Sequence, residues 1–506
     1  MSAPLPGWLD PIYEAAEMRS VDAWAIEERG VPSLDLMERA GIGLARVTAA
    51  AARPGPVRVV VGKGNNGGDG LVVARLLRED GHEVDVLAAA ELGELRGDAL
   101  ANLERLPGTA PEPFSAERLR GSGAVVDALL GTGFEGTPRE PLASVIAAIN
   151  AQDAPVVACD VPSGVSASSG EVEGEAVRAA LTATFHGPKV GLFLAPGKEH
   201  AGRVEVVEIG IPRGAPAPAA AGLISERVLE LFPRRERSGS KFTSGVVAVV
   251  GGSRGLTGAP TMAARAASRA GAGYVQVGVP ASAQPALDMR LLEQMSRGLP
   301  DTDGHHGPQG VEEAVRMADR AGAMVLGPGL GRDEGALEFA RQVAGGVEVP
   351  LLLDADGLGA HAGRLELLRE RSAPTVLTPH EGELGRLLQR DADEVARRRL
   401  AAAREAAERS GAVVLLKGDD TIVALPGGPL AISPGGTPAL ATAGTGDVLS
   451  GLIGALLAKG LGAFEAASLG TLAHVLAAEA AAARLGADHV LAGDVIEALP
   501  YGLTLR

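Results

Sequence analysis

The chain has 506 residues and a net charge of −16, from 47 lysines and arginines against 63 aspartates and glutamates. Because a single hydrophobic core stops growing at roughly 250 to 300 residues, this length predicts two domains. The negative balance argues against a nucleic acid or an anionic membrane as the main partner.

The cysteine content and the apolar runs indicate where such a chain would work. A single cysteine, Cys159, excludes an intrachain disulfide, and the first ten residues do not form a signal peptide, so we expect a cytoplasmic protein. Lys or Gly interrupts each apolar run well before the roughly 20 residues that a membrane span needs. We therefore expect no membrane-spanning segment.

The first half of the chain alternates short apolar strands with helical stretches. A helical pattern covers about 20–52, and strands are predicted at 57–61, 83–87, 124–129 and 155–159. Strands joined by crossover helices predict a parallel, doubly wound sheet, which binds ligands at the carboxyl ends of its strands. Three polar, glycine-bearing loops fall at that edge: GKGNNGGDG at 62–70, DALLGTGFEG at 127–136 and DVPSG at 160–164. Their convergence predicts a binding site.

The first of these loops has the glycine spacing of a dinucleotide fingerprint. In that fingerprint a tight turn brings backbone amides and a helix N-terminus close to a pyrophosphate. The spacing alone is weak evidence, because Asn65, Asn66 and Asp69 add amide and carboxylate oxygens to the turn. Such oxygens suit a cation or a hydroxylated ligand as well as phosphate, so the residues leave the ligand open.

A Pro-, Ala- and Gly-rich stretch at 212–222 separates the two halves. We expect domains over 1–215 and 236–506, joined by a linker at 216–235. A second series of strands and turns then carries the motifs GPGLG at 327–331, TPHEGE at 378–383, KGDDT at 417–421 and AGTGDVLSG at 443–451. The expected fold class is α/β throughout, with a Rossmann-like doubly wound sheet in the first domain.

The motif AGTGDVLSG is the most specific one in the chain. Gly444 and Gly446 free the backbone, and helical spacing over 448–458 places the amides of 445–447 at a helix N-terminus. Such amides stabilise charge on a transferring phosphoryl group, and Asp447 beside them can accept a proton from a substrate hydroxyl. The motif predicts a phosphoryl-transfer site, in a domain that resembles the ribokinase-like superfamily.

Taken together, the motifs resemble those of the bifunctional NAD(P)H-hydrate repair enzymes. In that family an N-terminal epimerase domain carries GNNGGDG, GTGF and D-x-P-S-G, and a ribokinase-like dehydratase domain carries GPGLG, TPHEGE, KG and AGTGDVLSG. All stand here in family order, from about residue 10 to the C-terminus. The resemblance implies epimerisation of R- and S-hydrated NADH or NADPH. It also implies dehydration of the S epimer to NAD(P)H with ADP, which yields AMP and phosphate.

The resemblance also assigns residues to these sites. Asp160 would be the acid/base of the epimerase, and Asp447 would be the base of the dehydratase. The epimerase would hold its substrate through Asn65, Asn66, Gly67, Gly68, Asp69, Gly131, Thr132, Gly133, Phe134, Glu135, Gly136 and Thr137, and the dehydratase through Gly331 and His380. The adenine nucleotide would contact Lys417, Gly418, Asp419, Asp420, Thr421, Thr445 and Gly446. K⁺ would bind Asn66, Asp127 and Ser163, and Mg²⁺ would accompany the nucleotide phosphates.

Each assignment has a purely structural alternative. Glycine turns often only connect two elements, and Asp127 or Asp447 could cap a helix. Asp160 could serve as a turn former, and His380 could be a satisfied loop histidine. The arginine-rich run at 397–411 is expected to be a solvated helix face.

Two other functions come from different classes. One is a vitamin or sugar kinase fused to a regulatory domain, and the other is a scaffold that only binds a nucleotide or a protein. Retention of GPGLG and TPHEGE argues against the first, and the presence of Asp160 argues against the second. Bacterial members of the family use ADP and eukaryotic ones ATP. The Ala-, Gly- and Arg-rich composition and the fusion are typical of a bacterial protein, so ADP is expected by analogy. A homo-oligomer is expected because the family tends to form one.

Overall fold

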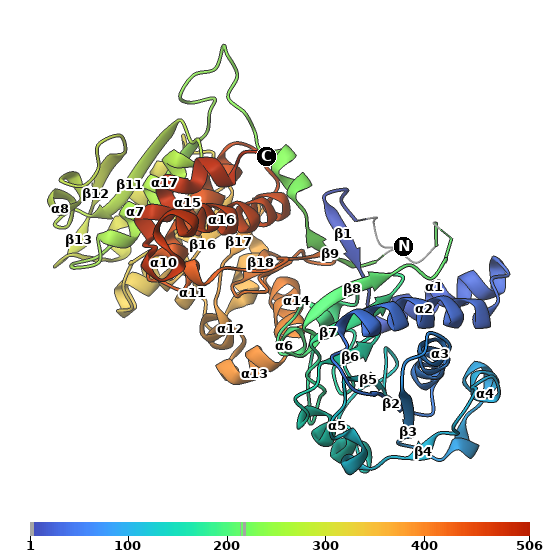
Figure 1. Cartoon of the computed structure of the whole chain (residues 1–506). Coiled ribbons are helices and arrows are strands. Elements are labelled where there is room, and N and C mark those ends of the chain that lie inside the picture. Colours follow the sequence, from blue (N-terminus) through green and yellow to red (C-terminus); the bar gives the residue numbers. More distant parts are fainter. Residues whose placement is uncertain (1–4, 213, 216–218, 506) are drawn as a thin grey trace. The chain divides into compact units, whose positions relative to one another are not determined.

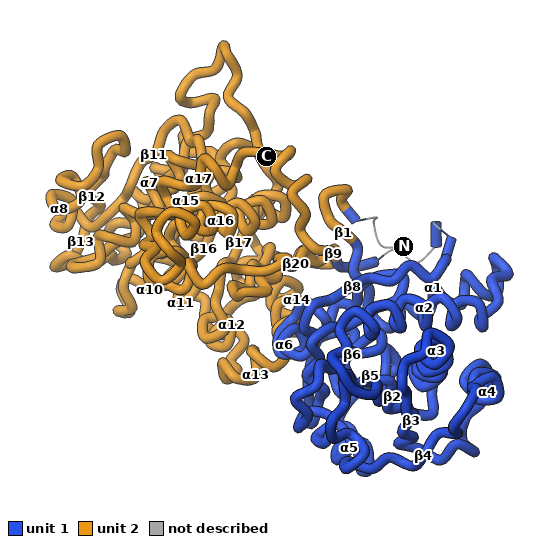
Figure 2. Tube along the Cα trace, viewed as in Figure 1, with its two compact units in different colours: residues 1–5, 11–221 blue, residues 6–10, 222–506 orange. Residues whose placement is uncertain are grey.

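The structure is a computed structural model that describes residues 5–212, 214–215 and 219–505. The chain divides into two compact units (Figures 1 and 2). Among the described residues, the first unit comprises Leu5 and 11–221, and the second comprises 222–505 together with Pro6–Asp10. Each unit has its own sheet with helices packed against it.

The first unit is built on a seven-stranded parallel sheet, in the order β4-β3-β2-β5-β6-β7-β8. Its strands are β2 (Val57–Val61), β3 (Val84–Ala88), β4 (Glu112–Pro113), β5 (Ala124–Ala128), β6 (Val156–Cys159), β7 (Leu181–Phe185) and β8 (Arg203–Val207). Its α-helices are α1 (Ala15–Ala23), α2 (Ser33–Ala51), α3 (Asn65–Glu79), α4 (Gly97–Glu104), α5 (Leu142–Asn150) and α6 (Gly197–Ala201). The strand order reverses between β2 and β5, so the loops after these strands diverge and leave a crevice.

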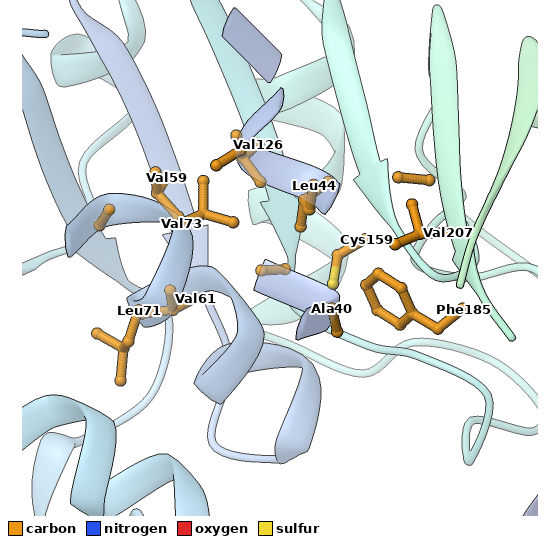
Figure 3. Close-up of a cluster of buried hydrophobic side chains, with 14 of the residues drawn as sticks. Ala40, Leu44, Val59, Val61, Leu71, Val73, Val126, Cys159, Phe185 and Val207 are labelled. Carbon is orange, nitrogen blue, oxygen red and sulfur yellow. The ribbon is translucent and has the colours of Figure 1, made fainter. Parts of the chain in front are cut away.

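Branched aliphatic residues explain why these segments form a sheet that is covered on both faces. All five residues of β2 are buried, as expected of a central parallel strand. Leu44 of α2 and Leu71 of α3 pack into one cluster with Val59 and Val126 of the sheet (Figure 3). Cys159 lies in the same cluster as a small buried side chain. The predicted doubly wound α/β sheet is confirmed.

The predicted helix over 20–52 is divided into separate segments. The π-helical turn Trp24–Glu28 follows α1, and α2 begins only at Ser33. Between them Gly30 adopts a φ of 68°, and Pro32 is the N-cap of α2. A left-handed glycine followed by a proline ends one helix and starts another, which a periodicity of apolar residues does not reveal.

The second unit contains an eleven-stranded sheet, in the order β1-β9-β20-β19-β18-β17-β16-β15-β10-β11-β12. Strands β10 to β12 and β15 to β18 pair in parallel, whereas β18, β19 and β20 pair antiparallel. The strands are β1 (Leu9–Ile12), β9 (Ala221–Ile224), β10 (Val246–Val250), β11 (Tyr274–Pro280), β12 (Met295–Leu299), β15 (Ala323–Leu326), β16 (Leu351–Leu353), β17 (Thr375–Leu377), β18 (Val413–Leu416), β19 (Ile422–Ala424) and β20 (Leu430–Ile432). A small hairpin, β13 (Asp301–Thr302) and β14 (His305–His306), stands apart.

The helices of the second unit follow the βαβ pattern. They are α7 (Gly258–Arg269), α8 (Gln284–Asp288), α9 (Val311–Ala318), α10 (Glu334–Gly346), α11 (Asp356–Gly359), α12 (Glu381–Leu388), α13 (Ala392–Arg397), α14 (Arg399–Ser410), α15 (Thr445–Ala458), α16 (Ala463–Leu485) and α17 (Ala492–Gly502). Helix α16 is long and apolar enough for a membrane span, a length that the sequence analysis did not anticipate. However, 72% of its apolar window is buried inside the protein, so α16 serves here as a core helix.

The boundary between the units differs from the expected linker. Residues 216–218, the first of that linker, lie outside the described residues, and the second unit begins at Gly222. Strand β9 pairs in the large sheet, and the 3-10 helix Glu226–Leu231 buries Val228 and Leu229. Apolar side chains inside a Pro- and Ala-rich stretch therefore bring most of 219–235 into the second unit.

Candidate active sites

A cavity of about 1260 Å³ opens at the carboxyl edge of the seven-stranded sheet. It exceeds the roughly 300–1,000 Å³ of pockets for drug-sized ligands, so it has room for a dinucleotide. The loops after β2, β5 and β6 supply three of its walls, as their convergence predicted. Among the residues proposed from the sequence, the lining includes Asn65, Asn66, Asp69, every residue from Gly131 to Thr137, and Asp160.

Gly67 and Gly68 have a different place, because they lie behind the cavity wall within α3. A Cβ on Gly67 would lie 2.0 Å from the carbonyl oxygen of Gly62, and one on Gly68 would lie 2.8 Å from Sδ of Met37. The missing side chains let the start of α3 approach the turn that precedes it. This close approach explains the glycines without any contact to a ligand.

Asp160 is held in a network of donors at the end of β6. Its φ is 66°, in the left-handed region that side chains other than glycine rarely adopt. Oδ2 accepts a hydrogen bond from the Thr132 hydroxyl. Oδ1 accepts from Lys189 Nζ at 2.6 Å, from Thr184 Oγ1 at 3.1 Å and from the Phe185 amide at 3.3 Å. Burial alone would raise the pKa of Asp160, but Lys189 and the hydrogen bonds hold it below its ordinary value.

Two of the other carboxyl groups in the cavity lining have raised pKa values, Asp22 on α1 and Asp69 on α3. Burial raises the pKa of Asp22 to about 6, an effect that Lys189 opposes and the charge of Asp160 reinforces. Burial, followed by the charge of Asp160, raises the pKa of Asp69 well above its ordinary value. The cavity thus places an ionised carboxylate beside carboxyl groups that retain protons more readily.

Asn66 in the cavity wall lies near the buried Asp127 and Ser163, because the carbonyl oxygen of Leu130 accepts hydrogen bonds from both Asn66 and Ser163. The Asp127 carboxylate accepts hydrogen bonds from the Ser163 hydroxyl at 2.6 Å and from the Ser163 amide at 2.8 Å. The Asn66 amide donates to the carbonyl oxygens of Leu130 at 2.7 Å and Cys159 at 3.0 Å. Burial raises the pKa of Asp127 to about 6, and no described residue forms an ion pair with it. A buried, unneutralised carboxylate among oxygen atoms suits a monovalent cation.

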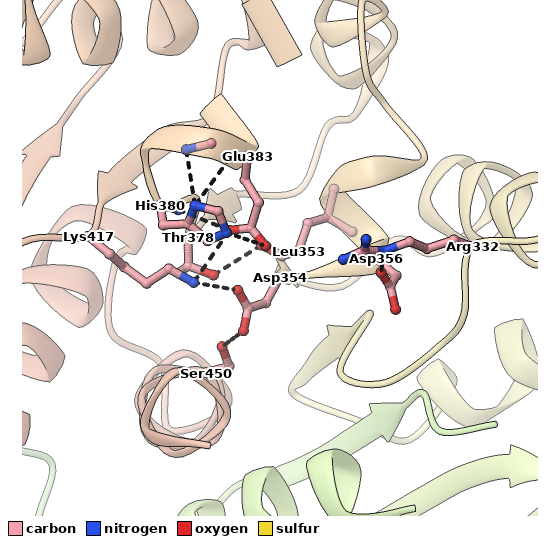
Figure 4. A network of polar contacts seen from close by, with 10 residues as sticks. Arg332, Leu353, Asp354, Asp356, Thr378, His380, Glu383, Lys417 and Ser450 are labelled. Atoms are coloured by element: carbon pink, nitrogen blue, oxygen red, sulfur yellow. Dashed lines mark hydrogen bonds and ion pairs between the residues drawn. The ribbon is translucent and has the colours of Figure 1, made fainter. Parts of the chain in front are cut away.

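In the second unit, a polar network joins the carboxyl ends of β16, β17 and β18 (Figure 4). Asp354, directly after β16, accepts hydrogen bonds from Lys417 Nζ at 3.1 Å and from the Ser450 hydroxyl at 2.7 Å. The Lys417 ammonium also lies 3.6 Å from the Glu383 carboxylate. Burial would lower the pKa of Lys417, but Asp354 and Glu383 outweigh it and raise this pKa. Lys417 is therefore a cation fixed between two acids.

Asp447 lies in the first turn of α15, beside this network. Gly444 is the N-cap of α15 and adopts a φ of 94°, so a side chain there would be strained. The first helical amides have no intrahelical partner, so those of 445–447 are available to an anion. Burial and the charge of Asp354 raise the pKa of Asp447 to about 7, whereas Lys417 opposes the shift. A carboxylate with such a pKa is poised to accept a proton near neutral pH.

A cavity of about 490 Å³ adjoins this network, and the turn between β18 and β19 forms part of its wall. Six of the seven residues proposed to contact the nucleotide line it: Lys417, Gly418, Asp419, Thr421, Thr445 and Gly446. The seventh, Asp420, is not on this wall, because its carboxylate pairs with the Arg399 guanidinium. Asp420 thus supports the turn through its ion pair with Arg399 and does not face the cavity.

His380 and Gly331 each form hydrogen bonds within the protein. His380 is the N-cap of α12, and its Nδ1 accepts hydrogen bonds from the amides of Gly382 at 3.0 Å and Glu383 at 3.3 Å. The structural alternative for His380, a histidine whose hydrogen bonds are satisfied within its loop, therefore holds for Nδ1. The side chain is nevertheless 55% exposed. The Gly331 amide donates to Asp356 at 3.0 Å. Neither residue lines the 490 Å³ cavity.

Several residues of these sites were not found from the sequence. Asp354 directly follows a buried strand in LLLDADGL, a position that could have identified it. Lys189 follows β7, a strand that the sequence analysis did not recognise. Asp22 gave no signal within its helical pattern. The prediction of a solvated helix face at 397–411 is wrong for Arg399, because this residue is buried.

Comparisons with known proteins cover both units. A family model described as NAD(P)H-hydrate dehydratase matches residues 247–501, and one described as YjeF-related protein N-terminus matches 33–191. A bifunctional NAD(P)H-hydrate repair enzyme Nnr of Moorella thermoacetica is 40% identical over 97% of this chain and 96% of its own length. The enzyme of the same name from Salinibacter ruber is 42% identical over 83% of this chain and 82% of its own.

Among solved structures, an ADP/ATP-dependent NAD(P)H-hydrate dehydratase of Bacillus subtilis, co-crystallised with ATP and Mg²⁺, is similar to part of the chain. It is 29% identical, with a TM-score of 0.48, over 55% of this chain and 95% of its own length.

Proposed function

Because the chain belongs to the family of bifunctional NAD(P)H-hydrate repair enzymes, we propose that it repairs hydrated NADH and NADPH in two steps. The first unit interconverts the R and S epimers, and the second dehydrates the S epimer with ADP and releases AMP and phosphate. The observation that carries the proposal is the setting of Asp447, whose pKa is raised to about 7 at a helix N-terminus beside Lys417.

The chemistry of the first step explains why a cavity with carboxyl groups of different pKa suits it. Hydration of the reduced ring places a hydroxyl on a carbon next to the ring nitrogen. To invert this carbon, one of its bonds must break and form again on the other face, which requires a proton acceptor and a proton donor. Asp160, kept ionised by Lys189, is the acceptor, and Asp22, whose pKa is raised to about 6, is the donor.

We expect K⁺ to bind at the floor of this cavity. Asn66, Asp127 and Ser163 would hold K⁺ through oxygen atoms, where the ion would neutralise the buried Asp127 carboxylate. Asn66 follows β2, Asp127 is the penultimate residue of β5, and Ser163 follows β6. A common ion would therefore hold the three loops of the epimerase site in one arrangement.

The second step overcomes the poor leaving ability of hydroxide. Asp447 accepts the proton of the substrate hydroxyl while the oxygen attacks the terminal phosphorus of ADP. The amides of 445–447 and Lys417 stabilise the transferred group as AMP departs. The C–O bond then breaks with release of phosphate, and the neighbouring ring carbon loses a proton, which restores the ring double bond. Mg²⁺ would neutralise the nucleotide phosphates; among the described residues no group of three His, Cys, Asp or Glu could hold a metal. An ion carried mainly by phosphates and water is usual for Mg²⁺.

The experiment that tests this function separates repair from a kinase reaction. Hydrated NADPH is incubated with the chain, Mg²⁺, K⁺ and ADP, and the products are separated by chromatography. We expect NADPH, AMP and inorganic phosphate in equal amounts. A stable phosphorylated alcohol in place of free phosphate would indicate the kinase alternative, and ATP in place of ADP tests the nucleotide preference.

Two expectations from the sequence stay predictions. We expect a cytoplasmic location from the single cysteine, Cys159, and from the first ten residues, and Cys159 is buried and free in the structure. The homo-oligomer rests on the family's habit and is tested by light scattering of the full chain.

A further inference from the structure

Arg399, the first residue of α14, is a buried cation between two loops of the second unit. Its side chain is only 3% exposed, whereas a solvated position was expected from the sequence. One end of the guanidinium, Nη1, forms an ion pair with Glu381. The other end, Nη2, lies 3.0 Å from the Asp420 carboxylate and donates to the carbonyl oxygen of Lys417 at 3.3 Å.

The partners of Arg399 belong to loops with different proposed ligands. Glu381 lies next to His380, in the TPHEGE loop assigned to the hydrated cofactor. Asp420 and Lys417 lie in the KGDDT turn assigned to the nucleotide. The two loops are neighbours, because the Lys417 amide donates to the carbonyl oxygen of Pro379 at 2.9 Å. Arg399 adds a side-chain bridge to this backbone contact.

The nucleotide turn closes directly over the guanidinium. A Cβ on Gly418 would lie 2.3 Å from Nη2 of Arg399, so a side chain at this position would displace the guanidinium. The Thr421 hydroxyl closes the turn by donating to the Gly418 carbonyl oxygen at 2.7 Å. Because the guanidinium is planar and rigid, its two ends hold Glu381 and Asp420 in one fixed geometry.

We propose that Arg399 is a positioning residue that couples the nucleotide turn to the substrate loop, so that ADP and the hydrated cofactor strengthen each other's binding. The proposal rests on the dehydratase function proposed above. Charge-assisted hydrogen bonds are strongest where water is excluded, and Arg399 and Asp420 are both almost completely buried. Coupling between two ligands is reciprocal, so either ligand can report it.

The test measures the Kd of ADP by calorimetry, with and without saturating S-hydrated NADPH. The full chain carries Asp447→Asn and Asp160→Asn, so that the bound ligands are neither dehydrated nor epimerised. Arg399→Met removes the bridge. Glu381→Gln weakens only its substrate end, and Glu381 is 40% exposed, so this variant is expected to fold. Arg409→Met on the same helix is the matched control, because Arg409 pairs only with Glu366 and Glu405 among the described residues.

The proposal predicts that hydrated NADPH lowers the Kd of ADP by roughly 5- to 150-fold in the parent, the usual range of such coupling. The ratio of the ADP Kd without hydrated NADPH to the ADP Kd with it should fall toward one in Arg399→Met and Glu381→Gln. It should stay unchanged in Arg409→Met. Arg399→Lys retains a charge beside Asp420 but cannot reach both carboxylates, so it should fold normally and lose most of the ratio.

Two results would overturn the proposal. One is an ADP Kd that hydrated NADPH does not change in the parent. The other is a ratio of the two Kd values in both Glu381→Gln and Arg399→Lys that equals the ratio in the parent. Failure of the parent chain, with Asp447 unchanged, to convert S-hydrated NADPH and ADP to NADPH is a distinct result, and it would overturn the proposed dehydratase function itself.

Discussion

Asp160 and Lys189 are buried together, and each makes the burial of the other tolerable. Their ion pair is 2.6 Å long, and the side chains are 11% and 2% exposed. The pair is also functional in our account, because Lys189 keeps Asp160 ionised and ready to accept a proton. Asp160 could be predicted from its motif in the sequence. Lys189 could not, because it lies 29 residues further along the chain and no local pattern marks an ion pair at that separation.

Removal of Lys189 tests this dependence. Lys189→Met leaves a buried, unpaired carboxylate, which typically costs about 3–5 kcal/mol of unfolding free energy. Because the folded pKa of Asp160 is depressed, its contribution is present above the ordinary aspartate pKa and is lost as the pH falls through the folded value. Urea unfolding at neutral and acid pH should therefore show a difference between Lys189→Met and the parent that shrinks in acid.

The matched control is Lys63→Met, because Lys63 pairs with Glu94 on the surface with its side chain 66% exposed. Such pairs contribute up to about 1 kcal/mol. A loss for Lys189→Met no larger than for Lys63→Met would contradict the role of the buried pair.

Asp447 should impose a pH dependence on dehydration. With a pKa raised to about 7, the carboxylate is protonated below neutral pH and cannot accept a proton there. We therefore expect kcat/KM for the S epimer to rise with pH through about 7. Asp447→Asn should lower kcat by roughly 10²- to 10⁴-fold, the usual contribution of a general base, and leave epimerisation intact. A profile that stays flat from pH 5 to 8 would remove Asp447 from the role of base.

At the scale of elements, the strand ends and glycine turns could be predicted, because they are local patterns. The parallel order of the first sheet followed from alternating strands and helices, and the three loops do line one cavity. The sequence could not predict that β1 joins the second unit's sheet. Leu9–Ile12 pairs with a strand more than 200 residues away, and this pairing depends on the folded arrangement. The coupling of two loops by Arg399 was out of reach for the same reason.

The glycines of the first loop should matter through packing. A Cβ in Gly67→Ala would meet the carbonyl oxygen of Gly62 at 2.0 Å, so the turn must open or α3 must shift. We expect a loss of roughly 1–3 kcal/mol and a strong fall in epimerisation. Gly93→Ala is the control, because no atom lies within 4 Å of the added Cβ. Equal thermal unfolding curves for both variants would refute the packing role.

At the scale of the whole chain, each proposed site is complete within one unit. The lining of the larger cavity lies within residues 18–209, and that of the smaller one within 417–475. The two steps should therefore work when they reside on different molecules. An equimolar mixture of Asp160→Asn and Asp447→Asn chains should consume both epimers, although each variant alone leaves material unrepaired. Failure of the mixture would mean that a single chain must carry both sites.

The most direct measurement follows the absorbance of reduced nicotinamide when separated R and S epimers of hydrated NADPH are given to the chain with ADP, Mg²⁺ and K⁺. Our account predicts complete recovery from both epimers with the parent. It predicts recovery from the S epimer alone with Asp160→Asn, and recovery from neither epimer with Asp447→Asn. Absence of recovery with the parent, with ADP or ATP, would contradict the account.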